Sequence, residues 1–490
     1  MRDWLALRAR ATPTRTAVVD VRSETAVSYA ALDARVEELA GRLSALGVGV
    51  DDHLGVVSRT RAAFVDLIHA AARVGAVLVP LNARYTASEL TATATAADLD
   101  CLVCERDTEA SATAFDGPVA TLDDPEAGAT DLAAVDSEPF EMPSWDRDCP
   151  QALVPTSGTT GEPKLVELTS GNLLASASAS SWRLGVLPSD RWYCMLPMYH
   201  MGGLAPVFRS VLYGTTAVVA TPGSFDASRA LDEMAAHDAT GVSLVPTMLR
   251  DLLDADDGGV LADLRFVLVG GAATPDALVE RCLDAGVPVH PSYGMTEAAS
   301  QIATARPTDA HAALGSVGTP LVFTEVTVVD EAGSAVSTGS VGEVVVSGST
   351  VTSGYYGAPE ATAEAFGPHG FHTGDAGYRD EEGRLWILNR LDDRIVTGGE
   401  NVDPGEVVAT LREHPEVDDA FVLGLPDEEY GQRVAALLVG TDDVDDVESF
   451  ARKQLAGFKL PRTWQVVDAL PRTASGTVDR SAARARFDEV

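Results

Sequence analysis

Lysine is the residue type that this chain most clearly lacks. Of its 36 basic residues, only Lys164, Lys453 and Lys459 are lysines, and 73 acidic residues leave a formal net charge of −37. A field of that sign repels phosphate backbones, so we expect no nucleic-acid partner. An acidic, lysine-poor composition is typical of adaptation to concentrated salt, where screening weakens self-repulsion. A GC-rich genome that favours arginine is the alternative for the lysine count, but it does not explain the excess of acid.

Long apolar runs and a disulfide framework are also lacking. The best candidate for a membrane span, residues 70–79, is interrupted by Arg73 and falls short of the roughly 18 apolar residues required. Charged residues interrupt positions 2–10, which excludes a signal peptide. Five cysteines are an odd number, typical of a reducing compartment; Cys101 and Cys104 lack the partners of a zinc site and are expected as semi-buried thiols at a strand end. The sequence thus predicts a cytoplasmic protein without a membrane span.

Helix and strand patterns alternate over the first hundred of the 490 residues and again over residues 217–290. Apolar spacing predicts a helix over 32–46, a strand over 54–58, a helix over 61–74 and a strand over 76–79 that Pro80 should stop. Residues 105–150 read as irregular surface loops. Strands return at 217–220, 241–245, 266–269 and 287–290. This alternation indicates α/β architecture with parallel sheets.

Two further regions depart from that pattern. Short β runs separated by glycine over 314–349 predict a compact β subdomain. The charged run at 389–393 marks a boundary, after which residues 391–490 begin an α+β pattern of their own. We therefore expect a domain over 1–390 and a smaller, mobile one over 391–490.

One polar stretch stands out as a candidate anion site: Thr156-Ser157-Gly158-Thr159-Thr160-Gly161-Glu162-Pro163-Lys164. Its glycines allow backbone N–H groups to face an anion, its hydroxyls add donors, and Lys164 adds charge. It is no Walker A loop, which requires four residues between its glycines and a lysine directly after the second. A polar surface loop is the plainer alternative.

Further motifs follow this stretch in a fixed order, and together they identify a family. They are Gly270-Gly271-Ala272, Ser292-Tyr293-Gly294-Met295-Thr296-Glu297, Thr373-Gly374-Asp375, Arg390, Asp392, and Gly398-Gly399-Glu400-Asn401. Over its whole length the chain resembles the adenylate-forming superfamily of acyl-CoA synthetases and peptide-synthetase adenylation domains. That resemblance implies two doubly wound α/β subdomains plus a β subdomain in the large domain, and a mobile C-terminal domain.

The resemblance also implies the role of each motif. Residues 156–164 hold phosphates, and Tyr293 and its neighbours hold adenine. Thr156 and Glu297 bind Mg²⁺, while Asp375 and Arg390 hold the ribose. Asp392 is the hinge, and Gly398 and Gly399 line the thiol channel. Oxygen ligands suit Mg²⁺ and a carboxylate suits a ribose diol, although Glu297 as a helix-terminal acid, Asp375 as a turn acid and Arg390 as a surface arginine stay as alternatives.

Two motifs concern the acid-binding side. His200, in Pro197-Met198-Tyr199-His200-Met201-Gly202-Gly203, matches the position that gates the family's acyl pocket, although a core histidine is the alternative. Gly270 and Gly271 should allow the backbone to approach the acyl group closely. Within the superfamily the chain is most similar to 2-succinylbenzoate–CoA ligases of menaquinone biosynthesis. That similarity implies ATP, Mg²⁺ and CoA as cofactor and co-substrates, and leaves the oligomeric state open, with a homodimer as one option.

One departure from the family concerns a catalytic charge. The family's final motif places a lysine after Pro-Arg-x-x-x-Gly, and here Gly476 is followed by Thr477. Losing a cation beside the reacting phosphate costs a few kcal/mol. Lys459 is the candidate replacement. Two alternatives therefore stay beside the main prediction: a ligase for another acyl or aryl acid, and a nucleotide- or acyl-binding homologue that no longer adenylates.

Overall fold

The computed structural model describes residues 3–144, 146–157, 163–393, 395–397, 400–402, 404–427, 430–441, 443–473 and 478–487. The chain divides into two compact units. The first comprises Met1–Val326 and Val346–Phe371, and the second comprises Thr327–Val345 and His372–Val490. A domain boundary after residue 390 stays a prediction.

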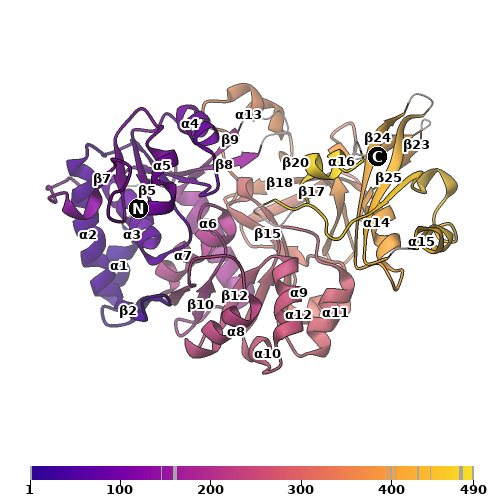
Figure 1. Cartoon of the computed structure of the whole chain (residues 1–490), viewed down its shortest axis with the longest axis horizontal. Helices are drawn as coiled ribbons and strands as arrows, with labels where there is room; N and C mark the ends of the chain where they lie inside the picture. The colour runs from indigo at the N-terminus through magenta and orange to yellow at the C-terminus, as the bar shows by residue number, and fades with distance from the viewer. Residues whose placement is uncertain are drawn as a thin grey trace. The chain divides into compact units, whose positions relative to one another are not determined.

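The first unit contains a seven-stranded sheet of order β7-β6-β5-β3-β4-β8-β9, coloured indigo and purple in Figure 1. Its neighbouring strands are parallel except for the antiparallel pair β8 and β9. The strands are β3 (His53–Val57), β4 (Val77–Leu81), β5 (Cys101–Cys104), β6 (Val119–Thr121), β7 (Thr130–Asp131), β8 (Pro150–Ser157) and β9 (Pro163–Thr169). Loops surround the short elements of residues 105–150, as predicted.

Two local predictions in this sheet were wrong. Pro80 does not stop its strand but lies within β4, in register with Val56 of β3. It lies past the Leu78 and Ala152 pair that joins β4 to β8, where its missing N–H interrupts no pairing with β8. Cys101 and Cys104 are not semi-buried: they are fully buried free thiols that begin and end β5.

A nine-stranded sheet of order β16-β15-β14-β13-β12-β10-β11-β1-β2 completes the α/β part of the first unit. Its central strands are parallel. The strands are β1 (Thr16–Asp20), β2 (Thr25–Ser28), β10 (Arg191–Cys194), β11 (Thr216–Val219), β12 (Gly241–Leu244), β13 (Phe266–Val269), β14 (Val289–Met295), β15 (Ser300–Thr304) and β16 (Thr319–Pro320). The strand expected to end at residue 290 thus continues through the predicted adenine motif.

Two helices contact both sheets and join them. Helix α3 (Ala62–Val74) packs on β4 and on β1, and α6 (Ser170–Leu184) packs on β9 and on β15. Nearly every residue of α3 is buried, including the polar residues Asp66, His69 and Arg73. Helix α7 (Met201–Tyr213) contacts β10, β11, β12 and β15. The two sheets therefore share a helical layer, as in a pair of doubly wound subdomains.

The remaining helices of this unit are short or peripheral. Helices α11 and α12 pack on β14 and on each other, and they are labelled side by side next to α9 in Figure 1. The remaining helices of the first unit are α1 (Trp4–Ala11), α2 (Tyr29–Ala45), α4 (Ala87–Ala96), α5 (Arg106–Ala112), α8 (Ala227–Ala236), α9 (Pro246–Ala255), α10 (Val260–Asp263), α11 (Asp276–Asp284), α12 (Pro307–Ala312) and α13 (Pro359–Ala365). None of the described helices is both long and apolar enough to cross a membrane.

The predicted β subdomain is present as a five-stranded sheet of order β17-β18-β20-β19, with β21 beside β20. Its strands are β17 (Thr324–Val329), β18 (Gly342–Gly348), β19 (Phe366–Gly367), β20 (Gly370–Arg379) and β21 (Leu385–Arg390). Glycine-separated β runs over 314–349 thus predicted the correct type of structure.

The C-terminal part of the second unit has the expected α+β pattern. Its sheet, of order β23-β22-β25-β24 with β26 beside β25, is made of β22 (Ile395–Thr397), β23 (Glu400–Val402), β24 (Asp419–Asp427), β25 (Gly431–Val439) and β26 (Thr463–Val466). Its helices are α14 (Pro404–Arg412), α15 (Val444–Ala451) and α16 (Arg480–Ala485). Val407, Leu411, Val422, Leu438 and Val447 form part of a separate core.

Candidate active site

The predicted phosphate loop connects the two strands of a hairpin. Thr156 of β8 stands directly opposite Lys164 of β9, and the Thr156 hydroxyl donates to the Lys164 carbonyl at 3.2 Å. Ser157 is opposite Pro163 in the same ladder. The intervening Gly158, Thr159, Thr160 and Gly161, and the side chain of Ser157, lie outside the described residues. The hairpin register therefore fixes both ends of the loop as neighbours.

Lys164 contacts the ring of Tyr355, and Tyr355 in turn donates a hydrogen bond to the buried carboxylate of Glu297. Its Nζ atom lies 5.0 Å from the ring centroid of Tyr355, within cation–π range. The Tyr355 hydroxyl donates to Oε1 of Glu297 at 3.0 Å, and both residues are only 9% exposed. The chain thus brings Lys164 and Glu297, two of the predicted site residues, against one tyrosine that sequence reasoning missed.

Tyr355 is held in place by pairing with the phosphate-loop hairpin. It forms an isolated bridge with Val166 of β9, and the Glu167 N–H donates to the Gly354 carbonyl at 3.1 Å. The Thr352 N–H donates to the Glu297 carbonyl at 2.7 Å. No local pattern marks Tyr355 in the sequence, because its role depends on a pairing almost two hundred residues apart in the chain.

These oxygen groups fit a magnesium ion that arrives with phosphates. Glu297 lies in the short helix η2 (Thr296–Ala298); Tyr355 occupies Oε1, while Oε2 accepts no described hydrogen bond. The described residues contain no cluster of three or more metal-ligating side chains. Mg²⁺ is typically held by one or two carboxylates plus substrate phosphates and waters, so a lone carboxylate with one oxygen unoccupied by any described group suits it.

The predicted adenine motif lies beside the glycines that follow β13. Val269 registers with Pro291, and a Cβ atom on Gly270 would lie 2.9 Å from the Ser292 carbonyl, which leaves little room for any side chain. Gly271 has a φ of +80°, and Ala272 follows it half-buried. Tyr293, Met295 and Thr296 are half-buried, and a Cβ atom added to Gly294 would lie only 1.9 Å from the Ser300 carbonyl oxygen. A flat, partly exposed tyrosine beside bare backbone is suited to adenine stacking.

His200 is placed by the start of α7 and not by a side-chain hydrogen bond. It is the N-cap residue of α7, and its Nε2 atom is buried with no hydrogen-bond partner among the described groups. Its ring lies 4.8 Å from that of Tyr199, and burial lowers the pKa of its imidazole. A neutral imidazole with an unpartnered nitrogen is suited to contacting a ligand.

Arg209 is a second residue suited to a binding site that sequence reasoning missed. It is 2% exposed, and its Nε and Nη1 atoms are buried without partners in the part of the chain that the structure describes. Its Nη2 donates to the Ser300 hydroxyl at 3.3 Å, and its guanidinium lies 5.0 Å from the Trp192 ring centroid. Burial lowers the pKa of Arg209 to about 10. A lone arginine within the otherwise uncharged residues 201–213 was the available signal.

The position of Arg209 relates it to the nucleotide motif. Ser300, which accepts its hydrogen bond, pairs with Met295 across β14 and β15. No described carboxylate forms an ion pair with Arg209, and an uncompensated buried charge is costly. The side chain is therefore suited to receive an anionic group of a ligand beside the predicted adenine motif.

The predicted ribose residues lie together in the second unit. Asp375 of β20 registers with Arg390 of β21, and the Arg390 Nη1 atom donates to Asp375 Oδ1 at 3.1 Å. The Thr373 hydroxyl donates to the Val344 carbonyl at 2.7 Å and accepts from the Asp375 N–H at 3.1 Å. Asp375 is buried, and Arg390 is half-exposed. The pair is thus set by strand register rather than by chance surface contact.

The remaining predicted residues are only partly visible. Asp392 belongs to the short helix η3 (Leu391–Asp393), but its side chain, together with Gly398, Gly399 and Thr477, lies outside the described residues. Lys459, in η4 (Gly457–Lys459), contacts both carboxylate oxygens of Glu406 at 2.6 Å. The exposed fractions of the two side chains are 23% and 46%, so the pair is a surface one.

Two α/β subdomains, with the predicted phosphate loop in a hairpin and a buried carboxylate beside it through Tyr355, are the arrangement expected of an adenylate-forming enzyme. The chain belongs to the AMP-binding enzyme family, whose model matches residues 5–356, and the model of the AMP-binding enzyme C-terminal domain matches residues 406–477. The resemblance seen in the sequence is therefore confirmed.

Individual relatives narrow the comparison. The chain is 36% identical over 493 aligned positions to a 2-succinylbenzoate–CoA ligase of Bacillus thuringiensis subsp. konkukian, covering 100% of this chain and 99% of the relative. The Bacillus subtilis o-succinylbenzoate CoA synthetase (MenE) in complex with the acyl-adenylate intermediate OSB-AMP superposes with a TM-score of 0.89 at 33% identity, covering 99% and 98% of the two chains. ATP-bound MatB from Rhodopseudomonas palustris gives the same TM-score at 30% identity, covering 99% of both chains.

Proposed function

We propose that the chain is an ATP-dependent acid–CoA ligase that converts 2-succinylbenzoate to its CoA thioester. In the first step a substrate carboxylate oxygen attacks the α-phosphorus of ATP and pyrophosphate leaves. In the second step the CoA thiolate attacks the acyl carbonyl and AMP leaves. The relatives of known name support this assignment, and the buried Arg209 is the observation in this chain that carries the choice of acid.

The substrate has two carboxylates, and the site offers a place for each. One must reach the α-phosphate beside the hairpin, while the other can pair with Arg209, whose Nε and Nη1 atoms lack partners among the described groups. A carboxylate there would compensate the buried guanidinium through paired N–H···O bonds. His200, neutral because of burial, would form an apolar wall of the acid pocket without adding charge.

The nucleotide would be held by the groups already described. Lys164, Thr156 and residues 157–161 would neutralise and orient the phosphates, and Tyr293 with Gly270, Gly271 and Ala272 would hold adenine. Glu297, oriented by Tyr355, would hold magnesium, which lowers the cost of the charge that develops on the phosphates. Asp375 and Arg390 would hold the ribose hydroxyls.

The C-terminal residues would serve the two half-reactions. Asp392 would act as the hinge, and Gly398 and Gly399 would line the path of the CoA thiol. Lys459 would supply the cation that Thr477 lacks. Its contact with Glu406 is a surface pair worth at most about 1 kcal/mol, which does not prevent the ammonium from leaving it. A cytoplasmic location and a homodimer stay part of this proposal.

A pyrophosphate-release assay in concentrated KCl with ATP, Mg²⁺ and CoA tests the acid. We expect 2-succinylbenzoate to be turned over and 4-oxo-4-phenylbutanoate, which keeps the succinyl chain but lacks the ring carboxylate, to be a poor substrate. Arg209→Met should abolish that preference. Equal rates for both acids in the unmodified protein would refute the assignment of 2-succinylbenzoate.

The remaining alternative is a homologue that binds acyl-adenylate but does not form it. Measuring thioester formation from synthetic acyl-adenylate beside ATP-dependent activity separates the two. Activity in both assays supports the ligase, and activity in the first alone supports the alternative.

A further inference from the structure

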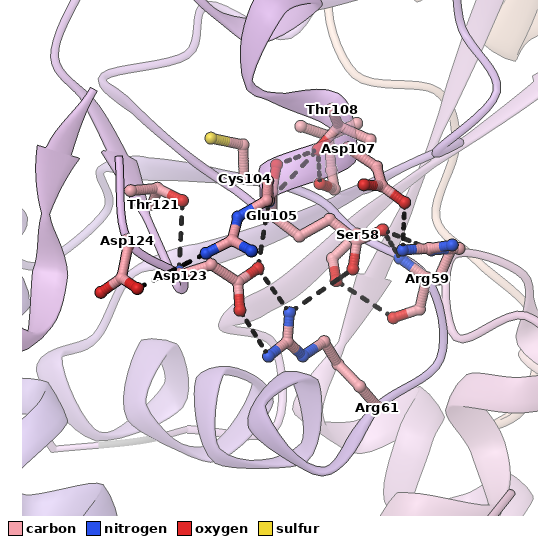
Figure 2. Close-up of polar contacts among 12 residues, drawn as sticks. Ser58, Arg59, Arg61, Cys104, Glu105, Asp107, Thr108, Thr121, Asp123 and Asp124 are labelled. Atoms are coloured by element: carbon pink, nitrogen blue, oxygen red, sulfur yellow. Dashed lines mark hydrogen bonds and ion pairs between the residues drawn. The ribbon is translucent and has the colours of Figure 1, made fainter. Parts of the chain in front are cut away.

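A buried ion network lies at the carboxyl ends of β3, β5 and β6, the edge at which α/β sheets place their ligands. Its centre is Glu105, 2% exposed, which follows β5 directly. Figure 2 shows Ser58, Arg59 and Arg61, from the segment after β3, directed toward this carboxylate. The nucleotide and acid residues described above do not include any member of this network.

The Glu105 carboxylate contacts three of the four residues that follow β3. The Ser58 hydroxyl donates to Oε2 at 3.1 Å, and the Arg59 backbone N–H and Nε donate to Oε1 at 3.2 and 2.7 Å. Arg61 lies 3.5 Å from Oε2 and donates to both oxygens of Asp123, at 2.8 and 3.0 Å. Contacts on both sides of Thr60 therefore fix the backbone of residues 58–61.

Thr60, the one member of that segment not directed at Glu105 or Asp123, faces the other sheet's loop. Its hydroxyl donates to the Leu196 carbonyl at 2.9 Å and accepts from the Met198 N–H at 3.2 Å. Thr60 is only 9% exposed, so water does not readily replace these bonds. One hydroxyl thus connects the segment after β3 with the loop between β10 and α7.

That loop carries His200. The His200 N–H donates to the Pro197 carbonyl at 3.1 Å, and its carbonyl accepts from Gly203 and Leu204 at 3.0 and 2.9 Å. Because the His200 Nε2 atom has no described partner, the position of the ring depends on the backbone of residues 196–200. A shift of this loop would move the histidine directly.

We propose that Thr60 is a positioning residue for acid binding and that the Glu105 network holds it in place. Thr60 fixes the loop of residues 196–200, and the loop fixes His200 against the acid. The inference rests on the proposed role of His200 in the acid pocket. Breaking the Thr60 hydrogen bonds should weaken acid binding while leaving the nucleotide residues, which lie on other elements, undisturbed.

The test compares Thr60→Val, which keeps the shape and removes the hydroxyl, with Thr60→Ser, which keeps the hydroxyl. KM is measured separately for the acid and for ATP, in concentrated KCl. We expect Thr60→Val to raise the acid KM about tenfold and to change the ATP KM less than twofold. Thr60→Ser should stay within threefold of the unmodified protein for both.

Thr216→Val is the matched control. Thr216 is 6% exposed and its hydroxyl donates to the Thr16 carbonyl at 2.9 Å, so the control loses one buried hydrogen bond where Thr60→Val loses two. It begins β11, at the opposite edge of the parallel strands from the loop that follows β10. The control should lower the melting temperature without changing either KM.

Glu105→Gln tests the network and remains informative if Thr60→Val does not fold. The amide keeps one acceptor for Ser58 or Arg59 but loses the charge, so we expect a rise in acid KM of about threefold to fivefold. The proposal is overturned if Thr60→Val and Glu105→Gln leave the acid KM unchanged, or if they change both KM values equally, as a general loss of stability would. If 2-succinylbenzoate is not a substrate, the same comparison with the acid that is turned over still tests Thr60, so the two proposals fail separately.

Discussion

The hydroxyl of Tyr355 donates to the carboxylate of Glu297 across 58 residues of chain, and the same ring lies under the ammonium of Lys164. A single tyrosine therefore links the group expected to hold magnesium with the group expected to hold phosphate. Its replacement should affect the step that needs both.

Tyr355→Phe should slow adenylation about tenfold and raise the Mg²⁺ concentration needed for half-maximal rate. The ring that Lys164 contacts is kept, but the bond that orients Glu297 is lost, and a hydrogen bond to a charged group is typically worth about 1.5–3 kcal/mol. The neighbouring Tyr356→Phe is the control, since its hydroxyl contacts the exposed Asp98 at 3.2 Å. Pyrophosphate release against Mg²⁺ measures both; equal effects would show that Glu297 does not need Tyr355.

Lys164→Ala should weaken productive ATP binding and slow adenylation by at least tenfold while the fold is kept. Lys164 is the last residue of the predicted phosphate loop and stands opposite Thr156 in the hairpin. One preorganised cation at a transferring phosphoryl group stabilises the transition state by a few kcal/mol. Lys453→Ala removes one of the other two lysines at an exposed position and should leave the rate unchanged. Normal ATP kinetics in Lys164→Ala would exclude this hairpin as the phosphate site.

Thr477→Lys should speed adenylation about tenfold, because it returns a cation to the reacting phosphate. A contact that stabilises the transition state by about 1.4 kcal/mol raises the rate by that factor. Lys459→Ala should abolish adenylation in the natural background, and Thr477→Lys should restore it. Thioester formation from preformed acyl-adenylate should change little in either variant. A loss of thermal stability without loss of adenylation in Lys459→Ala would mean that Lys459 serves only its pair with Glu406.

The buried His290 should make stability fall in acid. Burial lowers the pKa of His290 to about 4 from an ordinary value of 6.5. Between these values the unfolded imidazole binds a proton that the folded one does not, so the free energy of unfolding falls as the pH falls from 6.5 to 4, by up to about 3 kcal/mol. His290→Gln should flatten this slope in denaturant titrations, whereas the exposed His311→Gln should keep it. An unchanged slope in His290→Gln would contradict the assignment.

Salt should stabilise the protein strongly. The net charge of −37 is screened over about 3 Å at 1 M salt but over about 30 Å at 0.01 M. We expect the melting temperature to rise steadily with KCl up to molar concentrations. A melting temperature that is independent of KCl would refute adaptation to concentrated salt.

Sequence patterns predicted elements well where the signal was local. The alternation of helix and strand patterns along the chain located the parallel strands, and β13 matches its expected bounds of 266–269. The strand over 287–290 was cut short because Ser292, Tyr293 and Gly294 have no strand pattern; their extended backbone comes from pairing with β15. Pro80 was misjudged because its effect depends on which neighbour needs its N–H.

The candidate site residues likewise fall into those that a local motif identifies and those that only the fold identifies. The phosphate hairpin, Glu297 and the Asp375 and Arg390 pair were found because their residue types stand in contiguous motifs. Tyr355 and Thr60 were missed since each acts through a partner more than fifty residues away in the chain, and ordinary tyrosines and threonines carry no signal of their own. Arg209 was detectable, as a single charge in an apolar helix, but its lack of a partner is a property of the fold.

The register of the β8 and β9 hairpin has a consequence for how this segment can vary. Thr156 and Lys164 are opposite each other, so exactly five residues connect Ser157 to Pro163. Because side chains alternate between the two faces of a strand, removing or adding one residue would turn Lys164 away from the face it shares with Thr156 unless a bulge absorbed the change. A change in the length of this connection should therefore disturb the ladder or require a bulge, whatever residues it contains, and protein engineers who graft or shuffle this segment should keep its residue count.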